Sequence, residues 1–295
     1  MNQLKTISFV GSGALATALA KLLRAQGFAI GEIVARSAAA SQRKARALAR
    51  AVGAQPTTPG NAKLTCDLLW LAVPDEAIAE VSRMLAGCAK LPPVILHASG
   101  ALSSQALAEL AKRGVHTGSA HPMMTFVAGE PPSLKGAWFA LEGSQQALRT
   151  ARAIARKLGA RSFTIEPGAK PLYHAFGAML SPMLATELAA AEKIGLRAGI
   201  GARDVRRIME PIVLRTVRNV LRNGAGKSFS GPLARGDVRI VRSHLESLGA
   251  SPESHVYRAL MEYACEMLPV QRGGEMKKLL HRRGAGVGRK EPRVD

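Results

Sequence analysis

The sequence has few cysteines and few aromatic residues, and each shortage argues against a class of protein. Its three cysteines, Cys66, Cys88 and Cys265, are far apart and form no CxxC pair. An odd, scattered set argues against a disulfide framework and a zinc site, so we expect no metal and a reducing, cytoplasmic location. Aromatic residues make up 4% of the chain and alanine is abundant, which favours closely packed helices over an all-β design.

Long apolar runs are also missing. No run approaches the ~20 residues that a membrane span needs. The apolar stretch near the N-terminus fits a strand, a glycine turn and a helix, and we interpret it in that way rather than as a signal peptide. We therefore expect no membrane partner.

Acidic residues are scarce relative to basic ones. Asp and Glu number 21 against 41 Lys and Arg, for a net charge of +20. The basic residues are spread along helical segments, and no aromatic-studded RNA-binding motif accompanies them, so we expect no nucleic-acid partner. Anionic small molecules fit this charge better. We expect the basic residues 282–295 to form a flexible tail.

The order of the periodic segments predicts two domains. Up to residue 166, short apolar runs alternate with helical periodicity, which predicts an α/β domain with a mostly parallel sheet. From residue 167 to 281 the strand signals vanish, which predicts an all-α domain for substrate binding and dimerisation. The predicted strands cover residues 6–10, 30–35, 68–73, 94–97, 115–120, 138–141 and 162–165. The predicted helices include 41–52, 76–86 with Asp75 as its cap, 104–113, 145–158, 172–198, 202–223, 237–248 and 253–268.

The turn after the first predicted strand carries the clearest motif. Its residues are Gly11, Ser12, Gly13, Ala14, Leu15 and Ala16. The spacing of Gly11, Gly13 and Ala16 follows the dinucleotide fingerprint of a Rossmann domain, in which small residues allow a tight turn and a close approach of backbone to pyrophosphate. A strand before it and a helix after it supply the required context.

The end of the second predicted strand indicates which dinucleotide binds. NAD-binding domains usually place Asp or Glu there to hold the ribose 2′-hydroxyl. This chain has Arg36 and Ser37 instead, with Lys44 nearby. Arginine pairs well with a 2′-phosphate, so we predict NADP(H) as the cofactor. The ends of two later strands, Val73-Pro74 and Ala98-Ser99, are expected to line the same crevice.

Five further segments occur in a characteristic order. They are Leu71-Ala72-Val73-Pro74-Asp75, His97-Ala98-Ser99-Gly100, His121-Pro122, Lys170-x-x-Tyr173-His174 and Gly231-Pro232-Leu233-Ala234-Arg235-Gly236-Asp237. In combination they resemble a family of Rossmann-like NADP oxidoreductases with a C-terminal helical domain of unknown function. The resemblance covers about residues 5–270 and implies an architecture similar to pyrroline-5-carboxylate reductase and the β-hydroxyacid dehydrogenases. It also implies a helical domain of the 6-phosphogluconate-dehydrogenase-like type.

The first helix of the second predicted domain carries candidate catalytic residues. Lys170, His174, Gly177 and Ser181 recur at helical spacing and are expected to share one face. Hydride transfer to a C=O or C=N group needs a proton donor, and Lys170 or His174 is suited to that role. Family members often have Asn where this chain has Pro182, which weakens the transfer of a substrate-binding amide to this position.

Other candidates lie on loops. Ser99 follows a predicted parallel strand, where open α/β sheets bind ligands, and is a candidate for catalysis or for holding the nicotinamide. His121, Ser181 and Arg235 are candidate substrate residues, Arg235 as an anchor for a carboxylate or phosphate. Asp237 is expected to cap the next helix, with an Arg235–Asp237 ion pair as the alternative.

These features favour an NADP(H)-dependent oxidoreductase that acts on a small, anionic carbonyl or imine. The alternatives are a non-catalytic NADP-binding or redox-sensing protein and a deazaflavin-linked NADP oxidoreductase. An apolar helical domain also predicts a homodimer.

Overall fold

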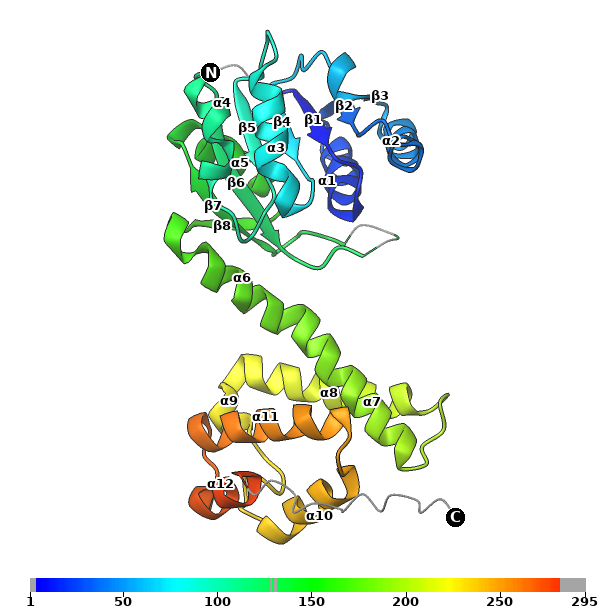
Figure 1. Ribbon diagram of the computed structural model, residues 1–295, viewed down its shortest axis with the longest axis vertical. Helices are drawn as coiled ribbons and strands as arrows, with labels where there is room; N and C mark the ends of the chain where they lie inside the picture. The colour runs from blue at the N-terminus through cyan, green and yellow to red at the C-terminus, as the bar shows by residue number, and fades with distance from the viewer. Residues whose placement is uncertain (1–3, 128, 130–131, 282–295) are drawn as a thin grey trace, which may run out of the picture. The chain divides into compact units, whose positions relative to one another are not determined.

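The computed structural model describes residues 4–127, 129 and 132–281, and it divides into two compact units, residues 1–181 and 182–295 (Figure 1). The predicted tail 282–295 lies outside the described residues. The predicted boundary near residue 166 falls before this division, because a further helix packs with the first unit. No helix in the described part of the chain is long and apolar enough to cross a membrane.

An eight-stranded sheet forms the centre of the first unit, in the order β3-β2-β1-β4-β5-β6-β7-β8. All neighbouring strands are parallel except β6 and β7. The predicted fold class, a mostly parallel α/β domain followed by a helical one, is confirmed. The strands are β1 (Thr6–Val10), β2 (Ala29–Val34), β3 (Gln55–Thr57), β4 (Leu68–Leu71), β5 (Val94–His97), β6 (His116–Met123), β7 (Trp138–Gly143) and β8 (Arg161–Thr164).

Helices cover both faces of this sheet (Figure 1). The helices of the first unit are α1 (Ala14–Ala25), α2 (Ala39–Val52), α3 (Asp75–Ala86), α4 (Ala108–Lys112), α5 (Gln145–Lys157) and α6 (Lys170–Ala178). One core joins α1, α2 and α5 to the sheet face that includes Phe9 and Trp70. A second core joins α3 and α4 to the opposite face, which includes Leu69 and Ile95. Burial on both faces explains why the central strands are apolar throughout.

The second unit is helical in its described part, residues 182–281. It consists of α7 (Leu184–Arg197), α8 (Val205–Asn223), α9 (Ala225–Ser228), α10 (Val238–Leu248), α11 (Pro252–Met267) and α12 (Gly273–His281). Its small core includes Val241, Met261 and Met276.

The long helix predicted over residues 172–198 is interrupted. A π-helical turn, Met179–Met183, separates α6 from α7 and contains Pro182. Proline has no backbone N–H and cannot complete the regular helical hydrogen bond, which accounts for the change of helix type at this point. The α-helical spacing that placed Ser181 on the face of Lys170 and His174 therefore does not extend to Ser181.

Candidate functional site

The glycine turn between β1 and α1 is held tightly by its neighbours. Gly11 has a φ of +112°, and a Cβ at this position would lie 2.2 Å from the carbonyl oxygen of Ala72. The Gly11 N–H donates to the carbonyl oxygen of Val34 at 2.9 Å. Gly13 has an ordinary φ of −75° at the N-cap of α1, and a Cβ there would meet nothing within 4 Å. Gly11 is thus required by the fold, whereas Gly13 leaves open space in front of the helix N-terminus.

A cleft of about 710 Å³ opens beside this turn. It is within the range typical of small-molecule and cofactor sites. Two amide–carbonyl bonds, from Gln42 Nε2 to the carbonyl oxygens of Ala35 at 2.8 Å and Arg36 at 3.0 Å, hold the chain that follows β2. The predicted cofactor residues that line the cleft are Gly11, Ser12, Gly13, Arg36, Val73 and Pro74.

Other predicted cofactor residues lie outside the cleft lining. Ala14 lines a neighbouring groove instead, Ala16 is buried in the core, and Leu15 packs against that core. Ser37 is exposed, and Ala98 is buried at the end of β5.

Several lining residues were not predicted from the sequence. Ser41 on α2 lies in the lining together with Arg36 and with Lys44, which was expected nearby, and Glu76 and Glu80 on α3 lie in it as well. The spacing of Ser41 and Lys44, three residues apart on one helix, was the signal that would have found Ser41.

Ser99 organises the loop after β5 rather than offering a free hydroxyl. Its Oγ donates to Asp75 Oδ2 at 2.8 Å and accepts the N–H groups of Ala101 at 3.1 Å and Leu102 at 2.9 Å. A serine hydroxyl has one donor and two acceptor positions, so all of them are used. The prediction that Asp75 caps α3 is wrong: Pro74 occupies the N-cap position, with no side-chain cap bond.

His97 is buried beneath the same loop. Its Nδ1 accepts the Ser99 N–H at 3.2 Å, and its Nε2 lies 3.1 Å from the carbonyl oxygen of Ser103. Burial lowers the pKa of His97 to about 4, so the ring is neutral at pH 7 with its proton on Nε2. His97 therefore has a structural role.

Lys170, at the start of α6, is fully buried. Its Nζ donates to the carbonyl oxygen of Ser99 at 3.0 Å and to Ser119 Oγ at 2.6 Å. Desolvation lowers its pKa to about 8, while the carboxylates of Glu142 and Asp75 act in the opposite direction. The ammonium group thus ties α6 to the ends of β5 and β6.

The burial of Lys170 predicts a dependence of stability on pH. Its pKa is about 8 in the folded chain and 10.5 for a lysine exposed to water, so between these values the unfolded chain holds this proton more strongly and the contribution of Lys170 to the free energy of unfolding rises with pH, by about 3 kcal/mol. The raised pKa values of the Cys66 thiol and of Tyr173 act in the opposite direction at alkaline pH. We therefore expect the change in the free energy of unfolding from pH 7.5 to 10.5, measured by urea denaturation, to be about 3 kcal/mol less favourable in Lys170→Met than in wild type.

Lys157→Met, at an exposed lysine of α5 in the same unit, is the control for this measurement and should show the wild-type dependence on pH. If the free energy of unfolding changes by the same amount between the two pH values in wild type and in Lys170→Met, then Lys170 does not contribute to the pH dependence.

Close to Lys170 in the sequence, the rings of Tyr173 and His174 both lie against the ring of His121. Tyr173 is buried, and its hydroxyl lies 2.7 Å from His121 Nδ1. Burial raises the pKa of Tyr173 to about 12 and lowers that of His121 to about 4. The ring of His174 is exposed and lies edge-on to that of His121, with 6.3 Å between the centroids.

Gly100 is required for this packing. A Cβ on Gly100 would lie 2.9 Å from both His121 Nε2 and His174 Cδ2. The structure therefore brings together four of the predicted site residues, Ser99, His121, Lys170 and His174, at the carboxyl ends of β5 and β6. Open parallel sheets bind ligands at this edge.

Ser181 and Arg235 are not part of this cluster. Ser181 lies in the π-helical turn. Arg235 belongs to the second unit and contacts Asp237 Oδ2 through Nε at 3.1 Å and through its terminal nitrogen at 3.0 Å. Asp237 stands at the N-cap of α10 without a side-chain cap bond. The ion pair is confirmed, and Asp237 occupies the predicted N-cap position, but it makes no side-chain cap bond because its carboxylate contacts Arg235.

Comparison with solved structures identifies the fold. A protein from Bacteroides fragilis, assigned as an NADP oxidoreductase by inference, is 24% identical over 88% of this chain and 97% of its own, with a TM-score of 0.75. A pyrroline-5-carboxylate reductase from Coxiella burnetii is 17% identical over 94% and 99%, with a TM-score of 0.59. A reductive aminase from Aspergillus terreus, in complex with NADPH and ethyl levulinate, is 18% identical over 94% and 99%, with a TM-score of 0.62.

Family models match both parts of the chain, although no curated protein sequence matches it. Residues 2–122 match the Rossmann-like domain. Residues 137–264 match the domain of unknown function DUF2520, which includes β7, β8, α5 and α6 as well as most helices of the second unit. The chain therefore joins a Rossmann-like domain to a domain of unknown function 2520.

Proposed function

We propose that this protein is an NADP(H)-dependent oxidoreductase. The observation that carries the proposal is the cleft beside the glycine turn, whose lining includes Arg36, Ser41 and Lys44. Two cations and a hydroxyl from the segment after β2 suit a 2′-phosphate, and no Asp or Glu lies between β2 and β3 to hold a free 2′-hydroxyl. The space in front of Gly13 suits a pyrophosphate at the N-terminus of α1.

We propose that the reaction takes place at the carboxyl ends of β5 and β6. Bound NADPH supplies a hydride to a carbonyl or imine carbon. His174 is the exposed member of the cluster, and it donates the proton that the product needs. Tyr173 and His121 hold the ring of His174 in position, and Lys170 holds the loop around Ser99 through the hydrogen bond to the Ser99 carbonyl oxygen.

For the substrate we propose a small imine or carbonyl compound with an anionic group. The fold is similar to that of a pyrroline-5-carboxylate reductase and a reductive aminase, and the net charge of +20 favours anionic ligands. A panel of cyclic imino acids, 2-keto acids with amines, and neutral ketones, followed by NADPH absorbance, tests the class.

The role of His174 predicts a specific loss of turnover. Removing a general acid typically costs about a hundredfold to ten-thousandfold in rate. We expect His174→Ala to lower kcat by at least a hundredfold in the NADPH assay and to leave the Kd of NADPH within twofold, because His174 is not in the cleft lining.

His116→Ala is the matched control and should keep full activity, since His116 is exposed at the start of β6, away from His121 near its end. NADPH binding without turnover of any substrate class would refute the proposal that the protein is an enzyme. An unchanged kcat in His174→Ala would refute the role of His174 as the proton donor.

We also propose that the second unit forms a homodimer. Three large apolar side chains that recur at helical spacing on α8 are exposed, Leu214 at 44%, Val217 at 37% and Leu221 at 80%. Exposed apolar patches of this kind mark protein interfaces, and sedimentation of the full chain at micromolar concentration tests the assembly.

A further inference from the structure

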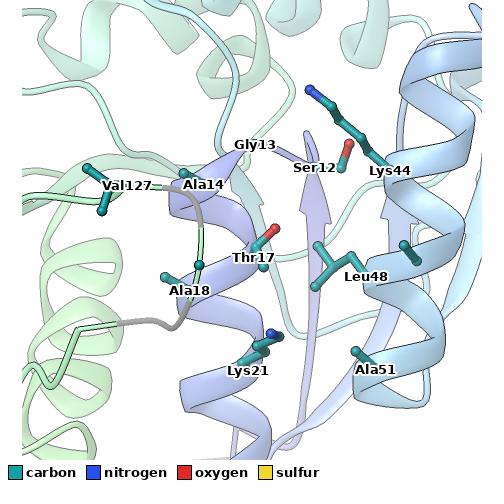
Figure 2. A pocket seen from close by; sticks show the side chains of 12 residues that line it. Ser12, Gly13, Ala14, Thr17, Ala18, Lys21, Lys44, Leu48, Ala51 and Val127 are labelled. Atoms are coloured by element: carbon teal, nitrogen blue, oxygen red, sulfur yellow. The ribbon is translucent and has the colours of Figure 1, made fainter.

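The lining of the cofactor cleft carries charges of both signs. Arg36 and Lys44 supply its cations, and Glu76 and Glu80 of α3 supply its carboxylates. Figure 2 shows Lys44 beside Ser12 of the glycine turn. The proposed function assigns phosphate groups to the cations and to the glycine turn. It gives the two glutamates no role, although a carboxylate in a site for a phosphorylated ligand repels the phosphates.

The position of Glu76 has a simple explanation, and that of Glu80 does not. The two residues are four apart on α3 and therefore share a face of the helix. Glu76 is in the first turn, where the helix dipole stabilises a carboxylate. Glu80 lies about 6 Å further along the helix axis, beyond the reach of that effect. The helix itself therefore does not account for a carboxylate at Glu80.

The Glu80 carboxylate is exposed and available to a ligand. Arg83, three residues further along α3, donates to the carbonyl oxygen of Ala79 at 3.4 Å, and no ion pair within the described part of the chain includes Glu80. Three apolar residues of α3 share the cleft lining with Glu80, namely Ala77, Val81 and Met84. Apolar surface around an acceptor suits an uncharged ring that bears N–H groups.

NADPH has one such ring next to its 2′-phosphate. The adenine is attached to the same ribose as that phosphate, so a 2′-phosphate at Arg36 and Lys44 brings the base into this cleft. The 6-amino group of adenine is a hydrogen-bond donor, and a carboxylate is an acceptor. On the basis of the proposed function, we infer that Glu80 binds this amino group and makes the cofactor site specific for adenine.

Deamino-NADPH, in which hypoxanthine replaces adenine, tests the inference. It keeps every phosphate of NADPH but has an oxygen at position 6, so the donor is lost and an acceptor faces the carboxylate. Titration of the full-length protein, followed by nicotinamide fluorescence, gives the Kd of each dinucleotide. We expect deamino-NADPH to bind at least tenfold more weakly than NADPH, the effect of losing a hydrogen bond to a charged group.

Glu80→Gln tests whether this side chain is the source of the discrimination. A glutamine amide can accept from the amino group of adenine or donate to the oxygen of hypoxanthine, so we expect the two Kd values to come within about threefold of each other. The loss of one negative charge affects both anionic ligands alike and cancels in the ratio of their Kd values. Glu166→Gln, at an exposed position of the first unit outside the cleft lining, should keep the wild-type ratio.

Equal Kd values for the two dinucleotides in the wild-type protein would overturn the inference and leave the proposed cofactor intact. A wild-type ratio in Glu80→Gln would also overturn it, because the base would then be recognised by another residue. If neither dinucleotide binds, the proposed function fails together with the inference.

Discussion

Gly11→Ala is expected to destabilise the first unit by about 2–4 kcal/mol and to abolish NADPH binding. The φ of +112° is strained for any residue with a Cβ, and that Cβ would lie 2.2 Å from the backbone oxygen of Ala72. The backbone of Ala72, which follows β4, cannot move aside as the end of a flexible side chain can. To remove the clash, β1 and β4 would have to separate where their strands pair. Urea denaturation and a fluorescence titration with NADPH measure the two effects.

Gly13→Ala is the matched control for this prediction. It changes a glycine of the same turn, at an ordinary φ and with nothing within 4 Å of the new Cβ. We expect the free energy of unfolding to stay within about 1 kcal/mol of wild type, while NADPH binds at least tenfold more weakly because the methyl occupies space that pyrophosphate needs. Equal stability of the two variants would contradict the distinction between the two glycines.

Arg36→Glu is expected to weaken NADPH binding by about a hundredfold or more and to change NADH binding by less than about threefold. The substitution replaces a cation with a carboxylate, and like charges in a binding site cost several kcal/mol. The 2′-phosphate is the group that distinguishes the two cofactors, so the loss should be confined to NADPH. Titration of both dinucleotides by fluorescence at one ionic strength measures the selectivity.

Arg43→Glu serves as the control for the change of net charge. Arg43 is exposed on α2, one residue from Lys44, and is not in the cleft lining. We expect it to lower NADPH affinity only about two- to threefold, through the weaker long-range field. If both variants lose NADPH affinity equally, Arg36 does not contact the phosphate.

Most of the sheet could be predicted because its strands are short apolar runs buried on both faces. Thr6–Val10 and Val94–His97 were predicted with the bounds that the structure shows. The edge strand Gln55–Thr57 could not be predicted, since it is polar, contains Pro56 and is three residues long. Hydrophobic periodicity carries no signal for such a strand.

The site was harder to predict because its contacts are distant in sequence. Helical spacing placed Lys170 and His174 on one face, but it did not show that one is buried and the other exposed. The burial of Lys170 depends on the carbonyl of Ser99 and the hydroxyl of Ser119, which are 71 and 51 residues away. Likewise, the motif around Ser99 does not indicate that its hydroxyl is fully hydrogen-bonded, to the Asp75 carboxylate and to two backbone N–H groups.

The full burial of Lys170 makes its amine a reporter of motion in the first unit. An amine-reactive label can reach exposed lysines at once, but it reaches Lys170 only when α6 lifts from the ends of β5 and β6. The rate at which mass spectrometry detects label on this one residue therefore measures the free energy of that local opening. If ligand binding draws α6 against the sheet, the labelling rate of Lys170 will fall. The dependence of that rate on ligand concentration will then give the affinity for the ligand without any assay of turnover.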